Sequence, residues 1–214
     1  MAPYLLLAGP YVRRRVGRRT EIELRGLPAR AHSRRFLVKN MKKNEGFTLI
    51  ELLIVVAIIG IIAAIAVPGL LRARQSGNEA SAIGSVRAVN SAEATYAASC
   101  GGGGYAQTLT VLGLAPAGGV PFISPDLSAA DPALKSGYTI TLADGLGAID
   151  VLAAANTCNG AGSNSRSAFY VHAEPIQVGS TGQRSFASNN AGTIYQLATG
   201  AVIPNTMAGA QLLQ

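Results

Sequence analysis

The sequence has few of the residue types that build catalytic and metal sites. It contains no tryptophan, two histidines and two cysteines among 214 residues. His172 is the only histidine after residue 46, and neither a Cys-x-x-Cys pair nor a Gly-x-Ser-x-Gly motif occurs. The sequence therefore lacks the clusters of His and Cys that form zinc sites and redox centres, and the motif that presents a serine nucleophile. We expect a protein that is not an enzyme and that needs no metal or cofactor.

Acidic residues are scarce in the first 46 residues, where three acids stand against twelve Lys and Arg. The remaining chain carries six basic and eight acidic residues, so the net charge of +7 belongs to residues 1–46, called the leader below. Excess positive charge can bind nucleic acid, but here it lies directly before an apolar run, where positive residues hold a chain end in the cytoplasm. We expect no nucleic-acid partner.

One long apolar run follows the leader. Residues 52–71 are Leu, Ile, Val and Ala, interrupted only by Gly60, Pro68 and Gly69. Twenty such residues span ~30 Å of hydrocarbon as a helix, and the run is longer than the core of a secretory signal peptide. We expect a single membrane-spanning helix, with a kink where Pro68 removes a backbone hydrogen bond and Gly69 follows it.

The helical pattern continues beyond the apolar run. No proline occurs between residues 72 and 99, and Ile83, Val86, Val89 and Tyr96 fall within about 140° of one helical face. One helix over residues 47–98 is about 78 Å long. The glycine run 101–104 ends it, and no Gly-Lys-Ser/Thr follows those glycines, so a phosphate-binding loop is not indicated.

Two cysteines lie beyond the apolar run, on the side that the charged leader places outside the cytoplasm. They are Cys100 and Cys158, 58 positions apart. Oxidation is permitted there, so we expect these two residues to form a disulfide. Closing a loop of this length is worth about 4 kcal/mol in the chain-entropy model.

The remainder of the chain predicts an antiparallel sheet. Residues 105–131 suggest an irregular connection with one helical turn near residues 109–112. Short segments of alternating character, separated by Gly, Asn and Asp clusters, then indicate a meander of four or five strands; they are 137–142, 148–152, 167–173, 184–187 and 193–197. Only the outer half of the long helix is left to cover the apolar face of this sheet. The predicted fold class is α+β.

The residues around the start of the apolar run resemble a known family. Gly46-Phe-Thr-Leu-Ile-Glu51, preceded by Lys42-Lys43 and followed by the apolar helix, is similar to the class III signal of type IV pilins and of the pseudopilins of type II secretion. The resemblance implies that a membrane peptidase cuts after Gly46 and methylates the new amino terminus at Phe47. The mature chains would then assemble into a helical filament with their helices bundled at its centre.

Glu51 is a lone carboxylate at the start of the apolar run. An ionisable group in the bilayer is expensive unless it is paired or protonated, and such groups usually mark function. After cleavage, the amino group of Phe47 is a positive charge at nearly the same depth in an adjacent subunit. We expect Glu51 to pair with it and so to favour one axial register; the alternative is a solvated Glu51 at the membrane interface.

The resemblance divides the chain into five segments: the leader (1–46), the membrane and assembly helix (47–71), the amphipathic outer helix (72–99), a connecting loop (100–135) and the sheet region (136–214). Met41 begins a complete short leader, so we expect translation to start there rather than at Met1. The implied partners are further copies of the chain, the prepilin peptidase, an inner-membrane assembly platform and, before assembly, membrane lipid. The precursor would lie in the inner membrane and the filament outside it.

Three functions are consistent with the sequence. The first, which we favour, is the structural subunit of a surface filament. The second is a pseudopilin of type II secretion. Major pseudopilins usually carry an acidic calcium-binding loop near the carboxyl terminus, whereas the only acid after Asp150 here is Glu174. The third is a membrane-anchored domain that never assembles, for which the outer region offers no polar constellation.

Overall fold

The computed structural model describes residues 46–213. The predicted leader up to residue 45, with Lys42 and Lys43, lies outside the described residues, as does Gln214. The first element is the helix α1, Leu49–Ser99, of 51 residues, about 76 Å long at 1.5 Å per residue. It begins two residues later than predicted because Thr48 has extended backbone angles and serves as its amino-terminal cap.

Two short helices and a 3-10 turn follow α1. They are α2 (Leu109–Leu112), α3 (Pro125–Ser128) and η1 (Ala154–Asn156). α2 lies at the predicted helical turn, where the side chain of Thr108 accepts a hydrogen bond from the Val111 N–H. α3 was not predicted from the sequence; it begins at a proline, whose fixed φ suits a first helical position.

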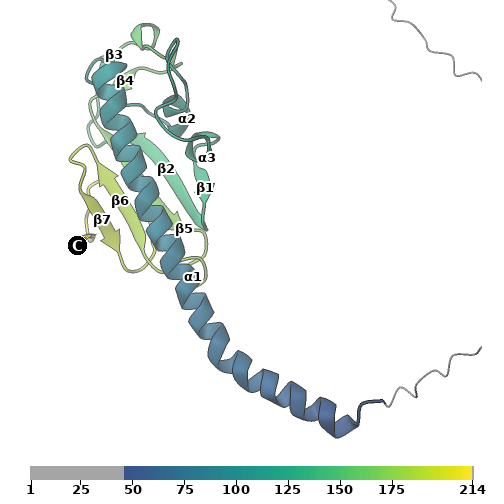
Figure 1. The fold of residues 1–214 in the computed structure, drawn as a ribbon. Coiled ribbons are helices and arrows are strands. Elements are labelled where there is room, and N and C mark those ends of the chain that lie inside the picture. The colour runs from purple at the N-terminus through teal and green to yellow at the C-terminus, as the bar shows by residue number, and fades with distance from the viewer. Residues whose placement is uncertain (1–45, 214) are drawn as a thin grey trace, which may run out of the picture. The chain divides into compact units, whose positions relative to one another are not determined.

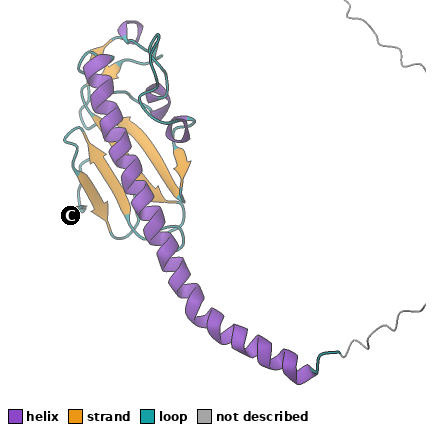
Figure 2. Cartoon of the chain, in the orientation of Figure 1, coloured by secondary structure: helices purple, strands orange, loops and turns teal. Residues whose placement is uncertain are grey.

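The main sheet has six antiparallel strands in the order β1-β2-β5-β6-β7-β8. Their bounds are Ala133–Lys135, Tyr138–Asp144, Phe169–Pro175, Ser185–Asn189, Ile194–Leu197 and Gln211–Leu212. Strands β1, β2, β5, β6 and β7 are labelled in Figure 1, and Figure 2 shows the sheet behind α1 in the same view. The helix and the antiparallel sheet together confirm the α+β fold class. β1, which the sequence pattern assigned to the connecting loop, shows that strand structure starts before residue 136.

The prediction of a single meander was wrong at one strand. β3 (Asp150–Leu152) does not join the main sheet but pairs with β4 (Ser165–Arg166) in a separate two-stranded ladder. The pattern over residues 148–152 gave the correct type of element, because short apolar alternation specifies a strand without specifying its neighbour. The connection between β2 and β5 is therefore long and carries its own ladder.

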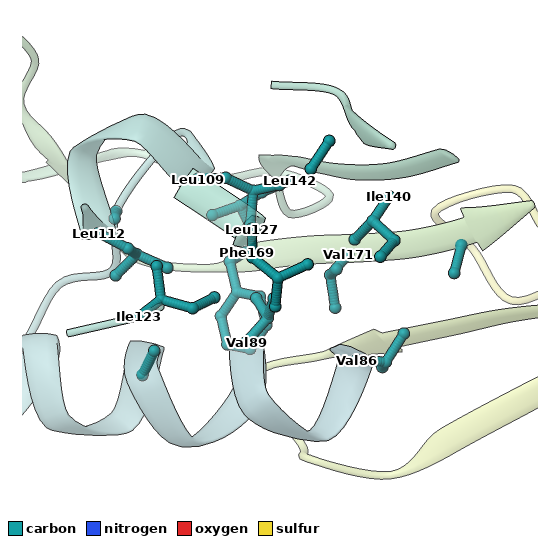
Figure 3. Packing of buried hydrophobic residues seen from close by; sticks show 14 of the residues in the cluster. Val86, Val89, Leu109, Leu112, Ile123, Leu127, Ile140, Leu142, Phe169 and Val171 are labelled. Atoms are coloured by element: carbon teal, nitrogen blue, oxygen red, sulfur yellow. The ribbon is translucent and has the colours of Figure 1, made fainter. Parts of the chain in front are cut away.

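The outer half of α1 covers one face of the main sheet, as predicted. Val86, Val89 and Tyr96 are fully buried, and Ile83 is partly buried against the same cluster. Figure 3 shows Val86 and Val89 of α1 beneath Ile140 and Val171 of the sheet, with side chains of α2 and α3 closing the cluster. Each fully buried aliphatic side chain contributes about 1.5–3 kcal/mol to folding.

The opposite face of the sheet is covered by the carboxyl-terminal segment rather than by a helix. Tyr170, Ala187 and Ile203 form a second buried cluster there, and the Tyr170 hydroxyl donates a hydrogen bond to the backbone carbonyl of Ile203. Sequence reasoning missed this cover because residues 198–210 show neither helical nor strand periodicity. Both faces of the sheet are thus shielded from water over part of their area.

The first half of α1 projects beyond the sheet (Figure 1). Its large apolar side chains between Leu49 and Leu71 are all exposed in the single chain. Among the described residues, α1 is the one helix long and apolar enough to cross a membrane. The helix continues through Pro68 and Gly69 without a break, and its ribbon curves in the projecting part (Figure 1). A local kink at Pro68 stays a prediction.

Candidate assembly and processing site

Glu51 is held by the cap of its own helix. Its carboxylate accepts hydrogen bonds from the backbone N–H of Thr48 at 2.8 Å and from the Thr48 hydroxyl at 2.8 Å. The Thr48 hydroxyl oxygen in turn accepts from the Glu51 N–H at 3.3 Å. This is a capping box, and it stabilises the helix start by satisfying two backbone donors that would otherwise lack partners.

Sequence reasoning missed the role of Thr48. The signal was present, because Thr48 stands three positions before Glu51 and directly before an apolar run, which is the capping-box spacing. Within residues 46–213, Glu51 takes part in no ion pair. The first basic residue along α1 is Arg72, 21 positions later, about 32 Å along the helix. A positive partner for this carboxylate must therefore come from elsewhere.

Gly46 lies two positions before Thr48, the residue that caps α1. A Cβ added at Gly46 would meet no heavy atom within 4 Å. A larger residue at this position therefore meets no steric barrier within the described chain.

The carboxyl end of α1 is fixed by a disulfide between Cys100 and Cys158, whose Cα atoms lie 4.8 Å apart. The glycine run that follows is closely packed: a Cβ at Gly101 would lie 2.1 Å from the Gly104 carbonyl oxygen, and one at Gly104 would lie 2.4 Å from the Ser165 hydroxyl. The run ends the helix, as predicted, and leads the chain back towards the β3–β4 ladder.

Polar side chains of α1 bind the chain between β5 and β6, close to the point where the helix leaves the sheet. Glu79 is buried and accepts from the N–H of Gln183 at 2.9 Å and from the guanidinium of Arg184 at 2.7 and 2.9 Å. Burial by itself raises the pKa of Glu79, but the hydrogen bonds from Gln183 and Arg184 outweigh it and hold the pKa below its ordinary value. Glu79 is thus ionised in a buried, well-paired position.

Glu93, farther along α1, has a different environment. Its side chain is fully buried, and one carboxyl oxygen accepts from the Ala106 N–H at 2.8 Å. The other oxygen has no hydrogen-bond partner among the described residues. Burial raises the pKa of Glu93 to about 8, and the bond from Ala106 offsets only part of this shift. Glu93 is therefore a neutral acid at pH 7, which the sequence pattern did not indicate.

His172 lies on the sheet face that points away from α1. Its ring stacks on Tyr170 with centroids 5.2 Å apart, and burial lowers its pKa. Within residues 46–213, no group of three or more His, Cys, Asp or Glu side chains is arranged to hold a metal ion. The charged residues of the globular part instead form local pairs, such as Lys135 with Asp126 at 2.7 Å.

Comparison with known proteins bears on the start of the chain. Residues 41–67 match the family model described as the prokaryotic N-terminal methylation motif. This range contains Gly46, Phe47 and Glu51. No solved structure matches the chain.

Similar proteins include two pilins and one secretion protein. The chain is 44% identical over 54 residues to the type IV major pilin protein PilA of Myxococcus xanthus, covering 25% of this chain and 24% of that protein. It is 59% identical over 39 residues to the type IV wide pilus major component PilA4 of Thermus thermophilus, covering 18% and 30%. It is 37% identical over 59 residues to the type II secretion system core protein G of Vibrio cholerae, covering 28% and 40%. The matches span less than half the length of each relative.

Proposed function

Because its amino-terminal segment carries the methylation motif of the type IV pilin and pseudopilin superfamily, we propose that this chain is the structural subunit of a surface filament of the type IV pilus kind. The leader is removed after Gly46, the new amino terminus at Phe47 is methylated, and the mature chains polymerise through α1. The precursor crosses the inner membrane once, with the leader in the cytoplasm. Processing requires the prepilin peptidase, and assembly requires an inner-membrane platform.

The observation that carries this proposal is the exposed apolar half of α1. Between Leu49 and Leu71 its large apolar side chains have no partner within the described chain, and burial of each contributes about 1.5–3 kcal/mol. Such a surface is stable in lipid or against other apolar helices, but not in water. A chain that leaves the bilayer must therefore exchange lipid for further copies of the same helix.

Glu51 sets the axial alignment of one α1 helix against the α1 helix of a neighbouring copy. Its carboxylate accepts from Thr48 in the single chain, yet an ionised carboxylate has about four acceptor positions. It can therefore keep the capping bonds and also accept from the charged amine of Phe47 in a neighbouring copy. Opposite charges attract strongly where water is absent, so only one axial alignment of the two helices satisfies both groups.

A pseudopilin of type II secretion is the second candidate. The similarity to core protein G of Vibrio cholerae supports it as much as the pilin similarities support the first, since each of the three matches covers only 18% to 28% of this chain. Against a major pseudopilin stands the carboxyl-terminal region, where Glu174 of β5 is the only acid after Asp150. A membrane-anchored domain that never assembles would use Glu51 only in the cap of its own helix.

The experiment is the substitution Glu51→Val, with Asp126→Asn as a matched control that removes an exposed carboxylate from α3. We expect Glu51→Val to insert and to be cleaved normally, because the helix becomes more apolar and the cut lies at Gly46. Assembly should fail, since removing one member of a buried pair typically costs ~3–5 kcal/mol. The measurement is the ratio of sheared filament to membrane-held subunit; a ratio equal to that of wild type would refute the role of Glu51.

A further inference from the structure

The loop between β5 and β6, residues 176–184, lies at the end of the sheet where α1 projects (Figure 1). It exposes two apolar side chains, Ile176 and Val178, which are 57% and 47% exposed. One side of Val178 lies against Gly200, since a Cβ on that glycine would be 2.8 Å from the valine Cγ2. Neither side chain belongs to the two buried clusters. The loop therefore presents apolar groups close to the helix that we expect to span the membrane.

Hydrogen bonds fix this loop at one position along α1. The side-chain amide of Gln75 donates to the Gly179 carbonyl at 2.5 Å, and that of Asn78 donates to the Thr181 carbonyl at 2.8 Å. Within the loop, the Thr181 N–H donates to the Gln177 carbonyl at 2.9 Å. The height of the loop above the membrane is thus set by the height of Gln75.

The charges of α1 indicate where Gln75 lies relative to a bilayer. Glu51 and Arg72 delimit a stretch of the helix without any charged residue. They are 21 positions apart, about 32 Å along a helix, which matches a hydrocarbon layer of ~30 Å. Headgroups add roughly 5–7 Å on each side. Gln75 follows Arg72 by about 4.5 Å, so the loop lies at the level of the outer headgroups when this stretch spans the bilayer.

Two arginines lie at the same level and on the same side of α1. Arg72 and Arg74 are both exposed, and neither forms an ion pair with an acid among residues 46–213. Arg72 stands three positions before Gln75, and Arg74 stands four positions before Asn78. Residues at these spacings are neighbours on one helix face. The helix face that binds the loop therefore carries two cations.

The other charges at this end of the sheet do not cancel these cations. Glu174 follows His172 by two positions in β5, so it lies on the sheet face that points away from α1. The remaining charged side chains neutralise each other in ion pairs, which are Glu79 with Arg184 and Lys135 with Asp126. The side of α1 beside the loop is positively charged.

We propose that, in the membrane-held subunit, the 176–184 loop binds the outer surface of an anionic phospholipid bilayer. Ile176 and Val178 lie among the headgroups, and Arg72 and Arg74 bind lipid phosphates, which suit the planar, multidentate guanidinium group. Basic residues beside a membrane are attracted to anionic lipids. This contact rests on the membrane topology of the proposed function and extends it from α1 to the globular part.

Quenching of a fluorescent dye by lipid measures the depth of the loop. The full chain carries Ser180→Cys, an exposed loop position, labelled with the native disulfide left oxidised. Vesicles of phosphatidylcholine and phosphatidylglycerol contain a lipid with a nitroxide on its headgroup. We expect strong quenching at Ser180 and weak quenching at the control position, Ile149→Cys. Ile149 is 67% exposed and follows the other end of the β2–β5 ladder, about 20 Å away.

A charge variant tests the role of the anionic lipid. It is Arg72→Gln with Arg74→Gln, and its matched control is Arg87→Gln, since Arg87 is exposed on α1 about 22 Å beyond Arg72. One arginine near an anionic surface favours binding about fivefold, so the double variant should shift the bound loop about 30-fold towards the free state. Quenching at Ser180 should fall in the double variant and in vesicles of phosphatidylcholine alone, and should be unchanged in Arg87→Gln.

Each result supports or overturns the contact. Quenching at Ser180 no stronger than at Ile149 overturns it, and a second reporter, Val178→Cys, repeats the measurement if the first variant misfolds. Quenching that is equal in neutral and anionic vesicles, or in the double variant and wild type, also overturns it.

Two results separate the contact from the function on which it rests. A chain that alkaline carbonate releases from the vesicles does not span the bilayer, which refutes the proposed topology and the contact together. Normal quenching by a chain that forms no filament refutes the filament function alone and supports the contact.

Discussion

Replacing Glu93 by glutamine should stabilise the folded subunit at neutral and alkaline pH and leave it unchanged in acid. Glutamine has the shape of the protonated acid and keeps the carbonyl oxygen that accepts from the Ala106 N–H. It differs in one respect that matters here, which is that it never ionises. The buried carboxyl of Glu93 has a pKa of about 8 in the folded chain and an ordinary value of 4.5 otherwise.

The sign and size of the effect follow from these two values. Below pH 4.5 Glu93 is protonated in both the folded and the unfolded chain, so it adds no pH dependence. Between pH 4.5 and about 8 the unfolded chain releases the proton and the folded chain keeps it, so the free energy of unfolding falls by about 1.4 kcal/mol per pH unit. At pH 7 this loss is about 3 kcal/mol, and above pH 8 it levels off near 5 kcal/mol.

The assay is thermal unfolding of the purified full-length subunit in detergent, followed by near-ultraviolet circular dichroism between pH 4 and 8.5. Other titrating groups, among them His172 and Asp131, are common to both proteins, so the difference between the variant and wild type isolates Glu93. We expect equal unfolding temperatures at pH 4 and a difference that widens steadily with pH. A difference that stays constant across this range would show that Glu93 is ionised in the folded chain and that our account of its burial is wrong.

Three further substitutions test the processing site, the disulfide and the polar contacts of α1. Gly46→Val should leave the precursor uncut in the membrane, whereas wild-type filaments should contain a chain that begins with N-methylated Phe47; intact mass spectrometry distinguishes them, and a mature chain that retains the leader would contradict the assignment. Cys158→Ser should lower the free energy of unfolding by about 4 kcal/mol and reduce subunit abundance more than cleavage, as seen on immunoblots; unchanged stability under oxidising conditions would refute a stabilising disulfide. Arg184→Met should cost about 2 kcal/mol near pH 7 by leaving Glu79 buried without its cation. Because pairing lowers the pKa of Glu79, this cost should shrink as the pH falls below 4.5, and denaturant unfolding at pH 7 and pH 3.5 measures both values.

The long-range pattern of the fold was predictable because it rests on periodicity that extends over many residues. Val86, Val89 and Tyr96 repeat on one face of α1 and are all buried, and β2 alternates over seven residues with its apolar side against the helix. β1, β4 and β8 have two or three residues each. Alternation of apolar and polar residues cannot be recognised over so few positions. These strands can therefore be assigned only from their pairing with neighbouring strands in the structure.

The polar features of α1 were less predictable for a different reason. Glu79 and Glu93 lie on the same helix and look alike in the sequence, yet one is ionised and the other neutral. The difference comes from Gln183 and Arg184, which are more than 100 positions away from Glu79 and reach it only once β6 is in place. Local sequence shows that an acid is present on an apolar face, but its protonation state depends on tertiary contacts.

The continuity of α1 has a mechanical consequence. The same 51-residue helix forms the projecting apolar half and one wall of the globular core, so no slack linker joins the two. In a filament built as we propose, tension applied to the surface of one subunit would pass directly into the helix and from there into its neighbours. The hydrogen bonds from Gln75 and Asn78 and the ion pair of Glu79 lie where the helix leaves the sheet. Under such tension these interactions would be loaded in parallel, so that each would carry only part of the force between the helix and the sheet.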